Sequence, residues 1–475
     1  MSTRVSLHCR AEAIALCLIL TLMMSLSLAS TARAEGDEER QGPRLPDPTY
    51  LLEDIEIIGD IKTTRSVVSD LLALELEQEV NVAVLNEARL RLLASGLFET
   101  AQFGLEAGSK RGFVVLVVTL EERNSILLSD LFLGSSARSP FWGGFGLVEG
   151  NFFGTGHSAR MAFVASDEQF AIELGYQVPK LFSTDFSFGV HLHSSASTEW
   201  AHPLVARPEL GREPFELDTV RLASRLSFGY AFSSAFSLFL DLRNDYLDSS
   251  SPFPELTHKL LHNGQSVLSS AILASELDTR DDPIMPRRGL RWHASVEGSS
   301  ADFLSNYDFL KLLTQLHLAW EFVPGHVLRG FAMAGGIFGD APYFDRFFVG
   351  DFDDLIPSRS LGLNFSARAP IDFFNSGADQ LSYETILLAV ACEYAIPLLE
   401  RIDWIYRMEF FVSAGLFAAT TPADERSEVQ LGLLPSHGPR GAFPFDLSAN
   451  LGLRVETPIG IFGLSFANAL SLIPF

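Results

Sequence analysis

The histidines and serines of this chain offer few arrangements that could perform chemistry. His191 and His193 alternate along one segment, and His258 and His262 are four residues apart. Each pair offers two ligands for a metal ion, whereas a protein zinc site needs at least three, and no third ligand stands at a helpful spacing. The sequence contains no Gly-x-Ser-x-Gly and no Cys-x-x-Cys motif. We therefore predict no catalytic residue, no metal and no cofactor, and we expect that the protein is not an enzyme.

Charged residues crowd the stretch from Leu277 to Gly298, LDTRDDPIMPRRGLRWHASVEG. Its first half is typical of a turn, in which short polar side chains bond to the local backbone while proline and glycine set the backbone angles. The predicted turn residues are Asp278, Arg280, Asp281, Pro283, Pro286 and Gly289. In its second half, apolar residues such as Trp292 alternate with polar ones such as Arg291. This period of two predicts a β-strand that follows the turn.

The same alternation recurs along most of the chain. Segments 170–177, 221–230, 236–243 and 447–456 each have one apolar face and one face of charged or small residues, with Phe239 as an exception. A soluble β-sandwich and a membrane barrel both produce this pattern. Repetition without helices from about Ile126 onward favours the barrel, because closure removes exposed sheet edges. We expect Leu240 and Trp292 to face lipid, and Asp241 and Arg291 to face the lumen.

The N-terminal residues and the composition indicate an exported protein. Arg4 and Arg10 precede an apolar run that ends before Ala34, so residues 1–34 are predicted to be a signal peptide. A transmembrane anchor is the alternative, but the run is shorter than the ~20 residues that a bilayer requires. The net charge of −24 argues against nucleic acid as a partner. After removal of the signal peptide, Cys392 is the sole cysteine, so no internal disulfide is possible.

Two further parts precede the strands. Residues 35–49 are charged and proline-rich, as in a solvated linker. Residues 50–123 predict a small α+β module, in which Thr63 or Thr64 could cap the first helix and Gly96 could end the second. The β-α-α-β-β order of this module resembles the polypeptide-transport-associated (POTRA) domain.

Four motifs in the strand region resemble the BamA-like outer-membrane β-barrel assembly family. They are the turn LDTRDDPIMPRRG, the strand-end motif EGNFFGTGHS with Asn151, Gly154 and Gly156, the loop approach DRFFVGD, and the strand CEYAIP. They occur in the family's order behind the POTRA-like module. The resemblance implies a transmembrane antiparallel barrel of about 16 strands over residues 124–475, although we recognise only about fifteen. It also implies that Phe475 is the terminal aromatic of a barrel recognition signal.

The resemblance implies a lumen motif as well. In the family, an arginine of a long loop reaches acidic residues on the following strands. We assign this role to Arg359, followed by Gly362, and we expect it to pair with Glu393. The second acid falls at Ser413, so one partner is missing. Arg329, in VLRGF, belongs by this assignment to the strand before the loop.

The implied function is insertion or translocation of polypeptides across a bacterial outer membrane, with the POTRA domain in the periplasm. The implied partners are outer-membrane lipids, unfolded client polypeptides, and periplasmic chaperones or accessory lipoproteins. The alternatives are a passive pore or structural surface barrel of the same fold, a two-partner secretion transporter, and a barrel enzyme. We expect the turn at Asp278–Gly289 to face the periplasm, and segments 194–218, 339–383 and 420–444 to lie outside or in the lumen.

Overall fold

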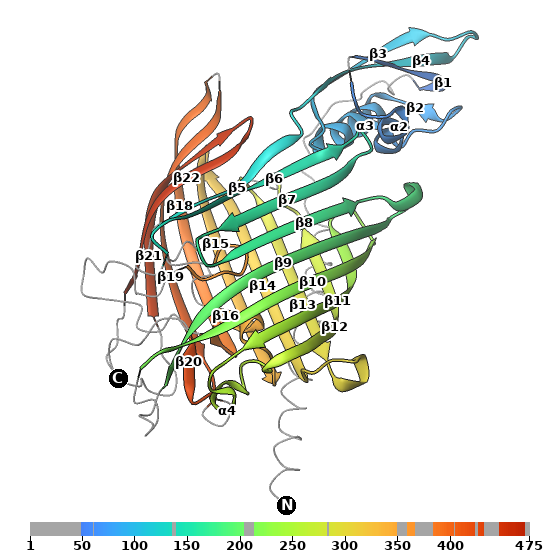
Figure 1. The fold of residues 1–475 in the computed structure, drawn as a ribbon. Helices are drawn as coiled ribbons and strands as arrows, with labels where there is room; N and C mark the ends of the chain where they lie inside the picture. The colour runs from blue at the N-terminus through green and yellow to red at the C-terminus, as the bar shows by residue number, and fades with distance from the viewer. Residues whose placement is uncertain are drawn as a thin grey trace, which may run out of the picture.

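A small N-terminal domain stands at one end of a large antiparallel barrel (Figure 1). This computed structural model describes residues 49–59, 61–134, 139–203, 213–282, 285–348, 359–365, 383–402, 404–422, 426–431 and 446–470. The predicted signal peptide, nearly all of the predicted linker, Pro283 and Phe475 lie outside these residues. Among the described residues, no helix has both the length and the apolar character needed to cross a membrane.

The N-terminal domain contains a four-stranded sheet with the order β2-β1-β4-β3 and two helices. Its elements are β1 (Tyr50–Ile58), α2 (Arg65–Leu72), β2 (Glu79–Val80), α3 (Val82–Ala94), β3 (Phe98–Ala107) and β4 (Phe113–Glu122). The helices and one face of the sheet enclose a core that includes Leu52, Leu72, Leu92 and Leu116, all fully buried. The predicted β-α-α-β-β order is thus present, with the two-residue strand β2 added between the helices.

The helix ends of this domain differ in part from the sequence prediction. Thr64 occupies the N-cap position of α2, but its side chain makes no capping hydrogen bond. The N-cap of α3 is Asn81, whose side chain accepts from the Val84 N–H. Gly96 follows α3 with a φ of 73°, the left-handed conformation that ends many helices.

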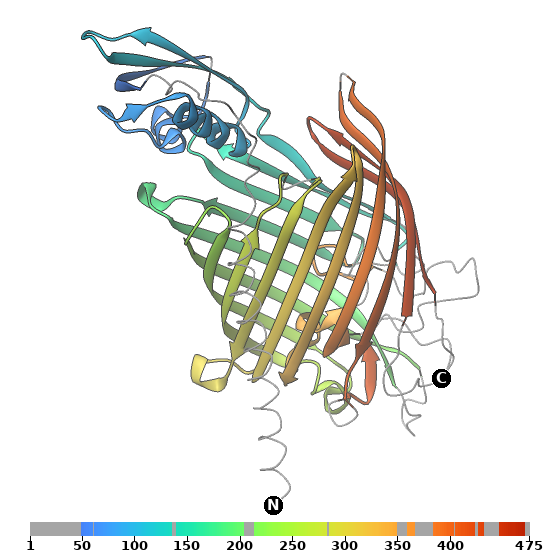
Figure 2. The ribbon, with the colours of Figure 1, turned by 180° about the vertical axis from the view of Figure 1, so that it is seen from behind.

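Fifteen antiparallel strands form the barrel wall in the described part of the chain. They are β5 (Ile126–Gly134), β6 (Trp142–Phe152), β7 (His157–Ala165), β8 (Phe170–Val178), β9 (Phe186–Pro203), β10 (Phe215–Ala231), β11 (Phe236–Ser250), β12 (Gly264–Asp278), β13 (Gly289–Ser299), β14 (Phe309–Val323), β15 (His326–Gly339), β18 (Ile386–Ile402), β19 (Ile405–Thr420), β21 (Asp446–Thr457) and β22 (Gly460–Leu470). Each pairs with its neighbours in chain order, so the path runs once around the lumen (Figure 2).

The wall strands present the two faces that their alternation predicts. On β11, Leu240 and Leu242 are each 46% exposed on the outer face, whereas Arg243 is 5% exposed and lies in the lumen. The same period places Trp292 outside and Arg291 inside on β13. Phe239 breaks the pattern because its ring lies in the lumen over Gly229 of β10, where a Cβ would lie 2.7 Å from the ring.

The far end of the barrel, opposite the N-terminal domain, is filled by an apolar core. Loops contribute α4 (Pro254–Thr257), η3 (Tyr343–Asp345), β16 (Phe347–Phe348), β17 (Tyr383–Glu384) and β20 (Val429–Leu431). β20 pairs with the end of β9, and β16 pairs with β17. The buried residues of this cap include Leu256, Leu260, Tyr343, Phe347, Phe348 and Val429. The described residues of the turn between β12 and β13, 279–282 and 285–288, lie at the end that faces the N-terminal domain.

Candidate functional site

Four charged side chains meet on the inner wall near the end that faces the N-terminal domain. We call this group, Arg329, Glu393, Glu409 and Arg454, the turn-side cluster. The Arg329 guanidinium donates to Glu393 Oε1 and to Glu409 Oε1, each at 2.7 Å. Arg454 reaches the same two carboxylates at distances of 2.7 to 3.1 Å. The cluster is held by four strands, since its members stand on β15, β18, β19 and β21, and its two positive and two negative charges balance.

This arrangement corrects the prediction for Arg359. Glu393 pairs with Arg329 and Arg454 and not with Arg359. The Arg359 guanidinium donates to the Phe344 carbonyl at 3.2 Å and lies over the rings of Phe348 and Tyr383. The predicted pair of Arg359 and Glu393 is wrong. Arg329 stands directly opposite Glu393 in the β15–β18 ladder, so the arginine of the strand reaches this carboxylate.

A second group of charges joins the long loop after β15 to the wall. We call Arg221, Arg243, Asp245, Glu297 and Asp345 the loop-side cluster. Arg243 donates to Asp245 at 2.7 Å, to Glu297 at 3.1 Å and to the loop carboxylate Asp345 at 2.9 Å. Arg221 also bonds to Asp245, at 2.9 Å. Because Arg243 is only 5% exposed, these carboxylates supply the partners that a buried guanidinium requires.

In the loop-side cluster, the charges of the loop and the wall have the opposite signs to those that were expected. Sequence reasoning predicted a loop arginine held by acids of the wall. Here the loop contributes the acid, Asp345, and the wall contributes Arg243. The Lys311 ammonium of β14 adds a hydrogen bond to the Asp345 carbonyl at 2.7 Å. The Phe344 ring meanwhile lies 4.5 Å from the Arg221 guanidinium carbon.

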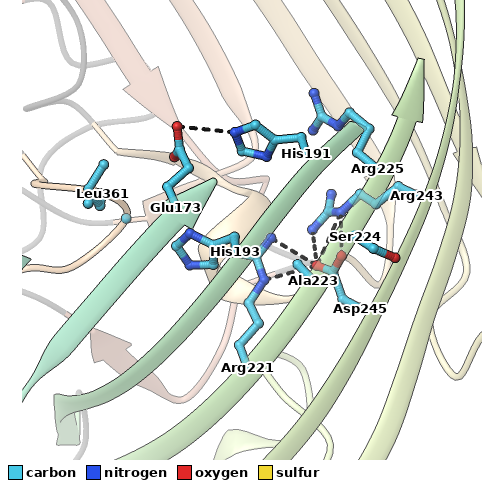
Figure 3. Close-up of a pocket in the computed structure, with 11 residues that line it drawn as sticks. Glu173, His191, His193, Arg221, Ala223, Ser224, Arg225, Arg243, Asp245 and Leu361 are labelled. Carbon is cyan, nitrogen blue, oxygen red and sulfur yellow. Dashed lines mark hydrogen bonds and ion pairs between the residues drawn. The ribbon is translucent and has the colours of Figure 1, made fainter. Parts of the chain in front are cut away.

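A cavity of about 240 Å³ lies beside the loop-side cluster and is lined by polar wall residues (Figure 3). His191 contacts Glu173 at 3.1 Å, while His193 projects into the same space, and Leu361 faces them from the loop. Gly362 lines the cavity too and has a φ of 80°. In the part of the chain that the structure describes, no group of three or more histidines, cysteines or carboxylates is arranged to hold a metal.

The second histidine pair of the sequence belongs to the far-end loops. His258 Nδ1 contacts the Glu255 carbonyl at 2.7 Å, and the His262 ring packs edge-on against Tyr307. The two side chains therefore have local partners.

The turn between β12 and β13 has both local and long-range contacts. The Asp278 carboxylate accepts from the Arg280 backbone and guanidinium, and Asp281 Oδ1 accepts from the Arg287 and Arg288 N–H groups. Gly289 has a φ of 105°, and a Cβ there would lie 2.4 Å from the Thr279 carbonyl oxygen. These contacts hold the described residues of the turn together.

Backbone carbonyls of the same turn extend into the lumen. The Pro286 carbonyl accepts from Arg329 Nε at 3.3 Å, and the Met285 carbonyl accepts from Arg407 of β19. The turn therefore connects to the turn-side cluster, and both border a cavity of about 410 Å³ that Ser413 also lines.

The strand-end motif, which begins in the last residues of β6, forms the joint with the N-terminal domain. The Asn151 amide donates to Thr63 Oγ1 at 2.7 Å and accepts from the Gly156 N–H at 2.9 Å. The Gly154 carbonyl accepts from the Thr64 N–H at 2.8 Å. A Cβ on Gly154 would lie 2.1 Å from the Lys62 carbonyl oxygen. Glycine is needed here because the two domains approach so closely.

Glu122, the last residue of β4, completes this joint from the N-terminal domain. Its carboxylate accepts from both the backbone N–H and the hydroxyl of Thr63. Burial raises the pKa of Glu122, but the Thr63 hydrogen bonds outweigh that effect and hold the pKa below its ordinary value. Sequence reasoning missed this contact, because it considered Thr63 only as one of two possible helix caps, with Thr64 as the other.

The strands β5 and β22 form a seam in the wall. They stand at the two ends of the hydrogen-bonded strand order, and no ladder joins them in the described residues. Because every neighbouring pair is antiparallel, the first and last of fifteen strands run in the same direction. Contacts occur at the turn before β22: the Leu128 N–H donates to the Ile459 carbonyl at 2.8 Å, and the Asn124 amide reaches the Pro458 carbonyl.

Fold and lumen together define an outer-membrane β-barrel with an N-terminal α+β domain. A family model described as the Omp85 superfamily domain matches residues 151–472. This match covers well over half of the chain, so the protein belongs to the Omp85 superfamily, and it is an outer-membrane protein.

Two curated relatives extend this result. The outer membrane protein assembly factor BamA of Nitratidesulfovibrio vulgaris is 24% identical over 333 residues, which cover 68% of this chain and 39% of that protein. BamA of Neorickettsia risticii is 23% identical over 431 residues, which cover 89% of this chain and 53% of that protein. The chain therefore spans about half the length of these relatives, or less.

Solved structures share the fold. BamA from Haemophilus ducreyi lacking POTRA domains 1–3 has a TM-score of 0.55 and 15% identity, with 89% of this chain and 82% of that chain covered. CdiB from Escherichia coli has a TM-score of 0.52 and 10% identity, with 93% and 89% covered.

Proposed function

We propose that this protein inserts polypeptides into the outer membrane, or passes them across it, without ATP and without covalent chemistry. The observation that carries the proposal is the seam between β5 and β22. A strand edge without a ladder partner presents N–H and C=O groups that can pair with another strand. A client strand would add to this edge and leave the barrel sideways into lipid.

The N-terminal domain would receive the client before the seam does. By resemblance we infer that it is a POTRA domain in the periplasm. The edge strands of its sheet are β2 and β3. One edge of β3 pairs with β4, and residues Leu105 to Ala107 of β3 are exposed. An extended segment could extend this sheet by main-chain hydrogen bonds, which bind many sequences. The joint at Asn151 would keep the domain beside the first wall strands.

The far-end core favours insertion over the alternative of a passive pore or structural barrel. The loop residues Leu260, Tyr343 and Phe348 pack there with the inner wall, and each is 4% exposed or less. A water-filled channel needs a polar lining at its exit, whereas this end of the described lumen is a dry apolar core. Because this core closes the far end of the lumen, a client would leave the barrel through the seam.

A reconstituted system tests the proposal. Purified protein in liposomes would receive a urea-unfolded small barrel protein as client, and heat-modifiable gel mobility would report the folded fraction. Cysteines at Leu128 and Ile459, in a Cys392→Ser background, would staple the seam, since the backbones there are hydrogen-bonded. We expect folding above that in empty liposomes, loss on oxidation and recovery on reduction.

Two results would reject the proposal: client folding no faster than in empty liposomes, or equal rates for the stapled and reduced forms. Depletion in cells followed by an outer-membrane proteome would then define the client range. Broad loss of barrel proteins indicates a general insertase, loss of a single protein indicates a dedicated transporter, and an unchanged proteome supports the passive barrel.

A further inference from the structure

Residues 359–365 of the loop after β15 run inside the lumen and pack on the inner side of β6, β7 and β8. We call this segment the brace. At one end, Arg359 lies over Phe348 of β16 and Tyr383 of β17, 5.5 and 5.4 Å from the ring centres. At the other end, Phe365 reaches β6. The brace thus joins the base of the loop, near β15 and β18, to the beginning of the barrel wall.

An aromatic stack makes the contact with the wall. The rings of Phe365 and Trp142 are 4.7 Å apart between centroids and inclined by only 8°. Trp142 is the first residue of β6. Phe132 of β5 packs against the same cluster. The brace therefore shares one apolar cluster with the inner side of β5, the strand that forms one edge of the seam.

Further contacts fix the brace to the next two strands. Leu363 and Phe365 are 1% and 3% exposed, and they pack with Val164 of β7 and Ala171 of β8. The Gln169 amide, just before β8, donates to the Asn364 carbonyl at 3.4 Å. These side chains are buried to the degree that is usual in a protein core.

The brace contains a tight turn with a strained backbone at Leu361. Ser360 and Leu363 exchange two backbone hydrogen bonds, so Leu361 and Gly362 are the central residues of a tight turn. Their φ values are 48° and 80°. Glycine and asparagine suit such positions, whereas leucine is disfavoured at positive φ. Leu361 is half-buried against the wall cluster, so its packing offsets the backbone strain.

We propose that the brace controls the seam from inside: its stack on Trp142 holds β5 and β6 in the closed arrangement, and its release lets β5 move away from β22. The physical reason is connectivity. In the described residues β5 has a ladder partner on one side only, β6, so its position depends on whatever fixes β6. The seam is the site of the proposed function, but the brace is testable on the barrel alone, without a client.

Distances across the seam provide the test. Spin labels at Leu133 of β5 and Leu464 of β22, both more than 60% exposed on the outer face, would be attached in a Cys392→Ser protein in lipid nanodiscs. Pulsed electron spin resonance would give the distance distribution. We expect Phe365→Ala to raise the ratio of long to short distances about two- to tenfold, as loss of one aromatic pair implies.

Controls separate the brace from general damage. Phe331→Ala removes another lumenal ring, which contacts His317 on the neighbouring strand, and should leave the distribution unchanged. Trp142→Ala should act like Phe365→Ala, and the double variant should add nothing to either. Phe365→Leu keeps the burial without the stack and should fall between, while heat-modifiable mobility confirms that each barrel has formed.

An unchanged seam distance in both Phe365→Ala and Trp142→Ala would overturn the brace, as would an equal shift in Phe331→Ala. Because no client is present, this result stands apart from the insertion assay. A protein that opens on loss of the stack yet inserts nothing would retain the brace and lose the proposed function.

Discussion

Arg329 and Arg359 stand in different surroundings, although sequence reasoning gave the ion pair to the second. Arg329 is 14% exposed and shares two carboxylates with Arg454, whereas Arg359 rests on aromatic rings and a carbonyl. When one partner of a buried ion pair is removed, the other charge stays buried without compensation. The protein then bears the desolvation cost of that charge. The side chain that matters most for the wall is therefore Arg329.

At the residue scale, we expect Arg329→Ala to destabilise the barrel by about 3–5 kcal/mol, the usual effect of removing one partner from a buried pair. Glu393 and Glu409 would then share Arg454 alone. Arg225→Ala is the matched control: its side chain is 44% exposed and 3.9 Å from Asp241, and such pairs are worth ~0–1 kcal/mol. Urea unfolding in lipid vesicles measures both, and equal losses would contradict the assignment.

At the element scale, the joint between the domains depends on one glycine. Gly154→Ala should release the N-terminal domain, because its Cβ would overlap the Lys62 carbonyl. Gly264→Ala controls for backbone strain, since Gly264 has a similar φ of 82° but no atom within 4 Å of the added Cβ. Spin-label distances between the domains should broaden in the first variant only. If the distance distribution broadened in both variants, backbone strain and not the overlap with Lys62 would explain the effect.

The N-terminal domain beside this joint should respond to acid. The hydrogen bonds from Thr63, which lies in the same domain, lower the pKa of Glu122, so the carboxylate is favoured when this domain is folded. The stabilisation is therefore complete above the free glutamate pKa of about 4.3 and is lost as pH falls through the lowered value. Glu122→Gln should remove this dependence. The readout is the free energy of unfolding of the N-terminal domain from pH 7 down to pH 3, and a variant that still loses stability in acid would point to another group.

At the scale of the whole molecule, the barrel separates lipid from lumen on adjacent strands. Leu240→Lys should cost roughly 2–4 kcal/mol, because the charge would lie in the bilayer. Ser227→Lys places the same side chain in the lumen, opposite Asp241 in the β10–β11 ladder, and should cost little. Unfolding titrations in vesicles compare the two. Equal costs would remove the support for a lipid-facing Leu240.

The orientation of the whole molecule has its own test. Asp282 lies in the turn at the N-domain end, and His258 lies in a loop at the far end. In intact cells, an impermeant maleimide should label His258→Cys and spare Asp282→Cys, each in a Cys392→Ser background. The reverse pattern would place the N-terminal domain outside the cell.

The sequence by itself determined the repeating strands, their two faces and the turns, because these follow from a period of two and from proline and glycine geometry. The Asp278–Gly289 turn and the outward Leu240 were readable for that reason. The motif around Asn151 was also visible, but its role was not, since Thr63 is 88 residues away in the chain.

Only the tertiary structure decided which charges meet. Arg329 and Glu393 are 64 residues apart, and the long loop between them leaves the register of β15 and β18 open until the wall closes. Asp345 with Arg243 and Phe365 with Trp142 are also pairs of distant residues, and the path of the loop inside the lumen brings each pair together. Local sequence sets the conformation of each strand, whereas the partner across a lumen is chosen by strand order, register and the packing of the loop inside.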